Sequence, residues 1–358
     1  MMKRIEKLLD VMEKENLDGM FLVKDANIRY LSGFTGSESY VVISEKGRAF
    51  ITDSRYTEQA EQECPGFEVI KWRSPNPDLP ETIKSVCARF GIKRLGFEKN
   101  CVSLDLYEKL KNGLGDVELA GTIGLVEKVR SVKDSDEIEC IKKAAEITDE
   151  AFDEILKYIK PGVTERDIER ELAYVIRKKG ADDIGFSIIV ASGKNSSKPH
   201  AIPSNKSVEA GDFITIDVGS MYNGYRSDMT RTVVLGKASD KQISIYNIVK
   251  KSQEESIKII KAGAECKVVD KLARDVIIEA GIKEVFEYGL GHGVGLEIHE
   301  EPSMSAKSTS TLEEGNVVTV EPGIYIPGWG GVRIEDTVVV TKDGCEIITK
   351  SPKHLIII

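Results

Sequence analysis

The amino-acid sequence predicts a two-domain chain of mixed α and β structure, with an α/β domain over residues 1–125 and an α+β domain over residues 126–358. Its 358 residues are long for one domain, and 41% hydrophobic with 30% charged residues is typical of a soluble globular protein. Helix and strand patterns alternate in the first region, whereas the second combines four helical patterns with strand-rich stretches. We expect the boundary at about residues 122–134, where the pattern changes.

The first region begins with an amphipathic helix, MMKRIEKLLDVMEKE, whose apolar side chains share one face. The apolar run 20–23 predicts a strand, and residues 40–51 predict a β-hairpin around the turn SEKG. Asp53 is a plausible cap for a helix over residues 53–63, and residues 91–100 predict another strand and turn. Polar motifs are too scattered here to indicate chemistry of their own.

The second region begins with a helix that Asp134 and Glu137 cap as a pair, and its apolar period ends at the tripeptide KPG. Thr164 caps the next helix, which stops at a glycine. Two more helices are expected at about residues 240–262 and 268–280. The strand-rich stretches lie between and after these helices, so helices and strands are mixed throughout the region.

Charge and composition exclude several classes of function. The formal net charge of −9 argues against a general affinity for nucleic acid, which requires a basic face. No apolar run approaches the ~20 residues of a membrane span, and the N-terminus lacks the apolar core of a secretion signal. The six cysteines are scattered without a CxxC pair, so we expect reduced thiols and a cytoplasmic protein.

Two strand-rich stretches of the second region repeat one pattern. Residues 214–234 contain T-I-D-V-G, then an acid followed two residues later by threonine, then Val-Val, and residues 317–340 contain T-V-E-P-G with the same continuation. One hairpin used twice would place four carboxylates on two facing ribbons, and chance similarity among hairpins is the alternative. The equivalent pairs are Asp217 with Glu321, Asp228 with Glu335, and Thr230 with Thr337.

The acids in these strands need compensation, because a buried carboxylate is costly unless its charge is balanced. Metal coordination is one compensation, and exposure to solvent or an ion pair is the other. Carboxylates suit hard divalent ions such as Mn²⁺, and His292 in GLGHGVG is the single nitrogen donor, whereas zinc sites more often use several His or Cys. Two ions that share bridging carboxylates can hold a hydroxide between them, as in known two-metal hydrolases.

Together these residues resemble the metallopeptidases of the pita-bread fold, which include aminopeptidase P, prolidase and methionine aminopeptidase. The similarity covers about residues 129–345. It implies two divalent metal ions, most readily Mn²⁺, with Co²⁺ or Zn²⁺ as alternatives. It also implies that Asp228 and Glu335 bridge both ions, that Asp217 completes one site, and that His292 with Glu321 completes the other. Glu321 is in addition a candidate proton shuttle for the attacking water.

The remaining motifs resemble the Xaa-Pro branch of this group. His200 in PHAIPS matches a histidine near the leaving group, and His299 in HEEP matches one that contacts the scissile peptide and steadies the developing oxyanion. Arg333 matches an arginine that contacts substrate or positions neighbouring acids, with a structural salt bridge as the alternative. Tyr325 matches a tyrosine that forms a hydrogen bond near the metals, and it is a candidate substrate-binding residue.

The first region resembles the non-catalytic N-terminal domain of aminopeptidase P and prolidase, in YLSGFTGSESYVVI and FITDSRYTEQA. The resemblance implies a homodimeric exopeptidase that acts on proline-containing peptides. It cleaves the Xaa-Pro bond either at the N-terminus of peptides or in dipeptides. The alternatives are a non-catalytic pita-bread binding module and another pita-bread hydrolase, such as a creatinase-like amidinohydrolase. The five filled ligand positions argue against both alternatives.

Overall fold

A computed structural model describes residues 2–283 and 286–358 of the chain. The chain divides into two compact units, one ending at Arg130 and the other beginning at Ser131. The boundary predicted between residues 125 and 126 lies within helix α6 (Leu125–Ser131). No helix in the described parts of the chain is both long enough and apolar enough to cross a membrane.

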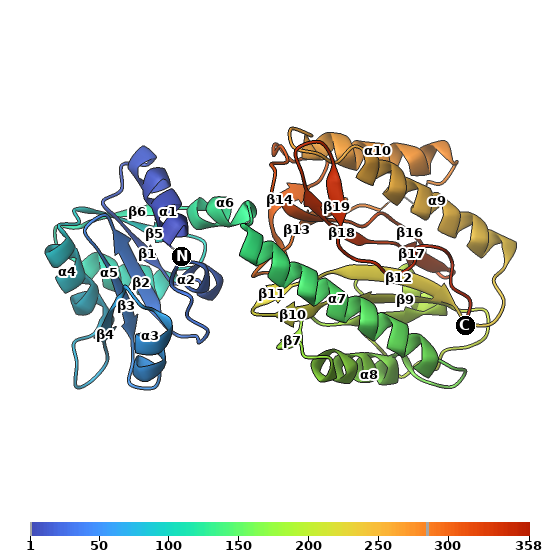
Figure 1. Cartoon of the computed structure of the whole chain (residues 1–358), viewed down its shortest axis with the longest axis horizontal. Coiled ribbons are helices and arrows are strands. Elements are labelled where there is room, and N and C mark those ends of the chain that lie inside the picture. Colours follow the sequence, from blue (N-terminus) through green and yellow to red (C-terminus); the bar gives the residue numbers. More distant parts are fainter. Residues whose placement is uncertain (1, 284–285) are drawn as a thin grey trace. The chain divides into compact units, whose positions relative to one another are not determined.

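The first unit is built on one six-stranded sheet with helices packed around it (Figure 1). The strands are β1 (Gly19–Leu22), β2 (Tyr40–Ser44), β3 (Gly47–Thr52), β4 (Glu68–Lys71), β5 (Arg94–Glu98) and β6 (Glu118–Thr122). Their order is β4-β3-β2-β1-β5-β6, in which β1, β2 and β3 pair antiparallel and the outer strands join by parallel pairs. Besides α6, the helices are α1 (Met2–Lys14), α2 (Asp25–Ser32), α3 (Thr57–Glu63), α4 (Leu79–Phe90) and α5 (Leu104–Gly113).

Most predicted elements of this unit are confirmed. The amphipathic first helix is α1, which buries three of its apolar side chains, and the predicted hairpin is the antiparallel pair β2 and β3. The predicted cap at Asp53 is wrong, because α3 begins only at Thr57 and has no side-chain cap. The Asp53 carboxylate instead accepts hydrogen bonds from the guanidinium groups of Arg55 and Arg73, which outcompete a helix N-terminus for this acid.

The helices of the second unit are α7 (Ser135–Tyr158), α8 (Glu165–Lys178), α9 (Asp240–Lys258) and α10 (Cys266–Glu279), with a short 3₁₀ helix η1 (Gly193–Ser197). Two of these helices, α7 and α8, begin where the sequence predicts caps. The Asp134 carboxylate accepts a hydrogen bond from the backbone N–H of Glu137, and the Glu137 carboxylate accepts one from Asp134, both at 3.0 Å. Thr164 and Asp167 form the same reciprocal cap at α8. Both predicted caps are therefore confirmed.

The strands of the second unit form several small sheets. They are β7 (Asp183–Ile184), β8 (Ile189–Ser192), β9 (Phe213–Val218), β10 (Ser220–Tyr222), β11 (Tyr225–Arg226), β12 (Met229–Val234), β13 (Gly291–Gly293), β14 (Glu300–Met304), β15 (Val317–Val320), β16 (Gly323–Ile326), β17 (Gly330–Arg333), β18 (Asp336–Val340) and β19 (Cys345–Ile347). Two sheets matter for function, β12-β9-β8 and β14-β13-β15-β18-β19. Each contains one of the two repeated stretches as an antiparallel pair, β9 with β12 and β15 with β18.

Each of these two sheets has its own pair of covering helices. Helices α7 and α8 share one apolar core with β8, β9 and β12, and α9 and α10 share another with β15 and β18. In Figure 1 the two helix pairs lie on opposite outer sides with the strands between them. Ile214, Ile216 and Val218 of β9 belong to the helix-side core, so the alternating residues Thr215 and Asp217 face the other strand layer. This arrangement places the polar faces of both hairpins toward one another.

Candidate metal centre

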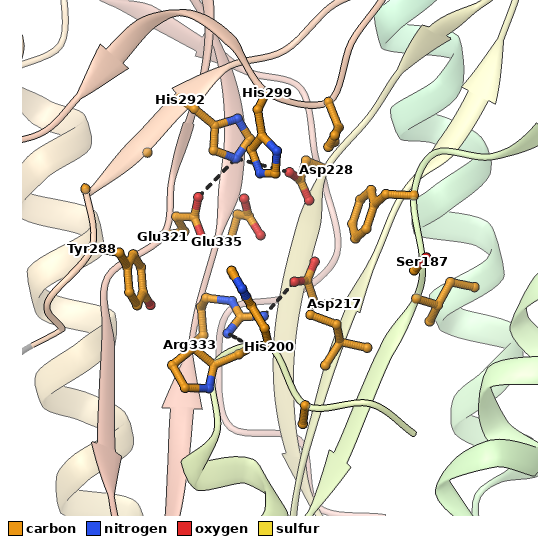
Figure 2. A pocket seen from close by; sticks show the side chains of 18 of the residues that line it. Ser187, His200, Asp217, Asp228, Tyr288, His292, His299, Glu321, Arg333 and Glu335 are labelled. Atoms are coloured by element: carbon orange, nitrogen blue, oxygen red, sulfur yellow. Dashed lines mark hydrogen bonds and ion pairs between the residues drawn. The ribbon is translucent and has the colours of Figure 1, made fainter. Parts of the chain in front are cut away.

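The four predicted acids lie at matching ends of the two hairpins. Asp217 stands near the end of β9 and pairs with Thr230 of β12, while Asp228 directly precedes β12. Glu321 directly follows β15, and Glu335 directly precedes β18. Figure 2 shows all four carboxylates pointing into the same space between the strand layers. The repeated sequence pattern therefore corresponds to a repeated structural position.

His292 completes this cluster from β13. Ligand atoms of Asp228, His292 and Glu335 lie within 4.8 Å of one another. The ring Nδ1 of His292 is 3.0 Å from the carbonyl oxygen of Gly293, and because a carbonyl only accepts, Nδ1 carries the hydrogen. Nε2 then faces the acids, 3.6 Å from Asp228 and 3.2 Å from Glu321, and is the nitrogen available to a metal.

The four carboxylates are buried close together, and the positive charge of Arg333 does not offset their mutual repulsion. Burial and the repulsion of neighbouring acids raise the pKa values of Asp228 and Glu335 well above the usual range of a carboxyl group. Burial also raises the pKa of Asp217, against the opposing charge of Arg333. Burial would raise the pKa of Glu321 as well, but its hydrogen bond to His292 and the charge of that ring lower it. A bound cation would relieve the repulsion that raises the first three values.

Two carboxylate oxygens indicate directly where a cation fits. Asp217 Oδ1 and Glu335 Oε1 are buried, and neither has a hydrogen-bond partner among the residues that the structure describes. The second oxygen of each acid is engaged, since Asp217 Oδ2 accepts from Arg333 Nη2 at 2.6 Å and Glu335 Oε2 accepts from Thr230 Oγ1 at 2.7 Å. Unpartnered buried oxygens are costly. Four carboxylates with one imidazole therefore fit hard divalent ions.

Arg333 contacts the protein through all parts of its guanidinium group and is only 2% exposed. Besides its bond to Asp217, it donates through Nε to Thr230 Oγ1 at 3.0 Å. Through Nη1 it donates to the Tyr325 hydroxyl at 2.8 Å and to the Pro199 carbonyl at 3.2 Å. These contacts make Arg333 a link between a candidate metal ligand and the wall of the site.

A cavity of about 770 Å³ opens over the acids. Its wall includes apolar side chains, among them Phe186, Ile189, Ile202 and Ile298. The predicted site residues that line it are Asp217, Asp228, His292, Glu321, Glu335, His200, His299 and Arg333. The cavity therefore combines a polar floor with an apolar wall, as small-molecule and peptide sites commonly do.

The two histidines outside the ligand set reach the cavity from different segments. The ring of His299 meets the ring of His292 edge-on, with centroids 4.3 Å apart. Burial, and then the neighbouring His292, lower the pKa of His299, which favours its neutral form. His200 lies on the loop that follows β8, directly after Pro199, whose carbonyl accepts a hydrogen bond from Arg333. The structure thus brings both histidines to the same cavity as the acids.

Tyr325 forms the hydrogen bond expected of it near the candidate ligand acids, through Arg333. Tyr325 is not part of the cavity wall, and its hydroxyl lies 2.7 Å from that of Tyr288 in addition to its bond with Arg333. Tyr288, which does line the cavity, was not predicted. The one available signal was its place four residues before His292 in YGLGH, which a sequence reading assigns to a loop.

Known proteins resemble both units of the chain. Residues 139–342 match metallopeptidase family M24, and residues 4–132 match the creatinase/prolidase N-terminal domain. The uncharacterized peptidase YqhT of Bacillus subtilis (strain 168) is 45% identical over 355 residues, which cover 99% of this chain and 100% of that protein. The mixed α/β fold with a pita-bread second domain is thereby confirmed.

Two solved structures extend this similarity. The Xaa-Pro dipeptidase from Bacillus anthracis has a TM-score of 0.96 and 45% sequence identity, covering 100% of this chain and 99% of that one. The X-Pro aminopeptidase from Thermotoga maritima MSB8 has a TM-score of 0.91 and 42% identity, covering 98% and 100%. The similar structures thus carry both of the activities between which the sequence motifs leave the choice open.

Proposed function

The chain belongs to metallopeptidase family M24, and on this premise we propose that it is a metal-dependent exopeptidase that hydrolyses Xaa-Pro bonds. Its substrates are peptides with proline as the second residue, Xaa-Pro dipeptides, or both. One observation carries the proposal: a five-residue ligand set shares its cavity with two histidines outside that set. The names of similar proteins, Xaa-Pro dipeptidase and X-Pro aminopeptidase, support the same substrate class.

The ligand assignment follows the carboxylate geometry. Asp228 and Glu335 would bridge two ions, Asp217 would complete one site, and His292 with Glu321 would complete the other. The unpartnered oxygens of Asp217 and Glu335 support this division. When bound, such ions polarise the scissile carbonyl and lower the pKa of water to near neutrality. Mn²⁺ suits the oxygen-rich set best, and Co²⁺ or Zn²⁺ can replace it.

The remaining residues perform the proton transfer and hold the substrate. Glu321 directly follows β15, and its carboxylate lies 3.2 Å from Nε2 of His292 at the floor of the cavity. It can accept a proton from the attacking water and deliver it to the proline nitrogen as the amide bond breaks. His299 donates a hydrogen bond to the carbonyl oxygen on which negative charge develops. His200 steadies the leaving-group side.

Arg333 and Tyr325 act indirectly in this proposal. The guanidinium group of Arg333 donates hydrogen bonds to Asp217, Tyr325, Thr230 and the Pro199 carbonyl. We therefore assign Arg333 to positioning a ligand acid. Tyr325 supports Arg333 by accepting a hydrogen bond from its guanidinium group. The alternative role of Arg333, direct contact with substrate, is less compatible with its 2% exposure.

Specificity for proline has a chemical basis. The bond before proline is a tertiary amide without an N–H, so a site that depends on that donor cannot hold it. The residue before proline is also biased toward extended conformations. An apolar wall beside the ligand cluster can accept the pyrrolidine ring, while the first residue's amine and carbonyl approach the acids and ions.

The test is to strip the protein of metal and reconstitute it separately with Mn²⁺, Co²⁺ and Zn²⁺. A Xaa-Pro dipeptide, a Xaa-Pro-Xaa tripeptide and a matched Xaa-Ala dipeptide are then assayed. We expect turnover of the proline substrates only, and the better of the two decides between dipeptidase and aminopeptidase. Peptide binding in a calorimeter without turnover by any metal form would contradict a peptidase and favour a binding module.

Two further expectations concern the protein as a whole. We expect a homodimer, which light scattering on the full chain will test. We also expect the chain to work in the cytoplasm, because its six cysteines are scattered without a CxxC pair. Neither expectation bears on the assignment of ligands.

A further inference from the structure

The loop that carries His200 is attached at both ends to one buried carboxylate. This loop, residues 192–204, runs from the last residue of β8 through η1 to Ser204, and we call it the His200 loop. At its start, Glu165 Oε1 accepts hydrogen bonds from Ser192 N at 2.6 Å and Ser192 Oγ at 2.9 Å. At its end, Glu165 Oε2 accepts from Ser204 N at 3.0 Å and Ser204 Oγ at 2.6 Å. Asn195 Nδ2 donates to both oxygens.

Glu165 is suited to this position by its place in α8. It is the first residue of the helix, where a negative charge interacts favourably with the helix dipole, and its side chain is 0% exposed. Burial would raise the pKa of Glu165, but the hydrogen bonds from Ser204, Ser192 and Asn195 lower it. An ionised carboxylate accepts hydrogen bonds only, which matches the all-donor surroundings.

The helix start holds the same loop through its backbone as well. The N–H of Arg166 donates to the Ser204 carbonyl at 3.1 Å, and the N–H of Glu165 donates to the Lys206 carbonyl at 3.0 Å. Backbone donors of a first helical turn have no partner within the helix, so the loop uses groups that need one. Side chain and backbone of α8 therefore fix the end of the loop together.

The middle of the His200 loop forms part of the cavity wall. Residues 199–203, including His200 and Ile202, all line the cavity. Ile202 is 85% exposed and the buried apolar side chain of this segment is the small Ala201, so apolar burial alone holds it weakly. Further polar attachments of the loop include the bond from Gly331 N to Ser196 Oγ at 2.9 Å and the bond from Arg333 Nη1 to the Pro199 carbonyl. Hydrogen bonds, with Glu165 making the largest share, hold the loop.

We propose that Glu165 is a positioning residue that fixes His200 over the substrate cavity by closing the His200 loop at its two ends. The inference rests on the proposed function in that His200 is taken to act on substrate. Glu165 touches neither the cavity nor a candidate ligand, so its effect on the reaction passes through the loop. A general contribution of Glu165 to folding is the competing explanation, and the experiment separates the two.

The test variant is Glu165→Gln, which keeps the size of the side chain but presents an NH₂ group to a ring of donors. The matched control is Asp149→Asn, because Asp149 clamps the C-terminal segment in the same manner. It accepts from Lys350 N at 2.7 Å and from Ser351 N and Oγ at 2.7 and 2.6 Å, on a segment that does not reach the cavity. Both variants remove one carboxylate from a clamp, and only one clamp holds His200.

In the wild-type background we expect Glu165→Gln to lower kcat by ~10–100-fold, the usual cost of losing a group that orients a functional side chain. Metal content by elemental analysis should stay at the wild-type level. In a His200→Ala background the same substitution should cost less than about twofold, because the loop then has no histidine to position. Asp149→Asn should leave kcat within about twofold in either background.

Amide hydrogen exchange over residues 193–203 gives a readout that does not need activity. We expect faster exchange there in Glu165→Gln and wild-type rates in Asp149→Asn. Unchanged exchange in Glu165→Gln, or equal kcat losses with and without His200, would overturn the positioning role. If the wild-type protein hydrolyses no proline substrate, the proposed function fails, while the exchange measurement still decides whether Glu165 holds the loop.

Discussion

The hairpin of β9 and β12 and the hairpin of β15 and β18 carry acids at equivalent positions but surround them with different partners. In the first, Asp217 bonds to Arg333, a permanent cation, at 2.6 Å. In the second, the equivalent Glu321 lies 3.2 Å from Nε2 of His292, which can be neutral. The repeated pattern thus places equivalent acids in two unlike surroundings, one beside a fixed positive charge and one beside an imidazole that is a candidate metal ligand.

The threonines of the two hairpins also differ in what they hold. Thr230 of the first hairpin donates to the side chain of Glu335 in the second, at 2.7 Å. Thr337 of the second donates to the backbone carbonyl of Asp228 in the first, also at 2.7 Å. Each hairpin therefore supports one of the two proposed bridging acids, carried by the other hairpin, but only one of the two bonds orients a candidate ligand oxygen. Sequence equivalence does not ensure equal function here.

The largest effect should come from replacing Asp228 or Glu335, the two acids that we propose to bridge both ions. Asp228→Ala and Glu335→Ala should each lose at least one metal and lower kcat/KM by ~10²–10³-fold or more, as expected when preorganised charge is removed. Elemental analysis and steady-state kinetics measure both quantities. Asp343→Ala, at an exposed acid after β18, is the control. Two retained ions in either ligand variant would show that the bridging assignment is wrong.

The two hairpins also differ in the residue that directly follows Asp228 or Glu335. Met229 follows Asp228, whereas Asp336 follows Glu335 and is buried against Arg231 at 2.8 Å and Lys353 at 2.7 Å. Asp336→Asn leaves two cations without their partner, so we expect a loss of ~3–5 kcal/mol in the free energy of unfolding. Met229→Leu in the other hairpin should cost less than ~1.5 kcal/mol. Denaturant unfolding compares the two.

The stability of the wild-type protein and that of Asp336→Asn should depend differently on pH. Burial would raise the pKa of Asp336, but Arg231 and Lys353 hold it below its ordinary value of 3.8. Its stabilising contribution is therefore complete above pH 3.8 and is lost as the pH falls through the lower folded-state pKa. The stability gap between wild type and Asp336→Asn should narrow in acid, and a gap that stays constant down to pH 3 would contradict the ion pair's role.

Arg333→Lys tests whether the first hairpin needs a guanidinium or only a charge. Lysine keeps the charge but cannot reach Asp217, Tyr325, Thr230 and the Pro199 carbonyl together. We expect a ~10–100-fold loss in metal affinity, the range for groups that orient ligands. Titration of metal into the stripped protein measures it. Wild-type affinity would mean that charge alone matters and that the contrast with His292 is smaller than the geometry indicates.

The smallest effects should come from the two threonines. Thr230→Val removes two buried hydrogen bonds, the one to Glu335 and the one from Arg333, whereas Thr337→Val removes one, at ~1–3 kcal/mol of stability per bond. Only Thr230→Val should also weaken metal binding, because one of its partners is the Glu335 carboxylate. Parallel thermal unfolding and metal titration distinguish the pair. Equal metal affinities in both variants would remove this distinction between the hairpins.

Several local features of this chain are predictable from its sequence. The caps at Asp134 and Thr164, the β2–β3 hairpin and the repeated stretches at 214–234 and 317–340 all depend on residues close together in the chain. Caps, turns and strand alternation are short-range interactions, so their residue types carry the information. The acids and His292 could be proposed for the same reason, since their motifs are contiguous.

The failures and omissions have a common cause in long-range contacts. Asp53 does not cap α3 because Arg73, from twenty residues away, joins the neighbouring Arg55 in binding its carboxylate. The hydroxyl of Tyr288 meets that of Tyr325, 37 residues away, and Glu165 holds a loop up to 39 residues further along the chain. No local pattern distinguishes these side chains from ordinary loop or helix residues. Only the packing of separate segments assigns their partners.

Sequence alone determined which residue types this protein offers to a metal and where its helices and hairpins begin, because those depend on neighbours along the chain. The tertiary structure decided which acid stands beside Arg333 and which beside His292, and which carboxylate oxygens have no partner. Those pairings join residues more than a hundred positions apart on one side and 29 apart on the other. They arise only when two strand layers meet face to face, since burial then forces each charge to find its partner across the gap.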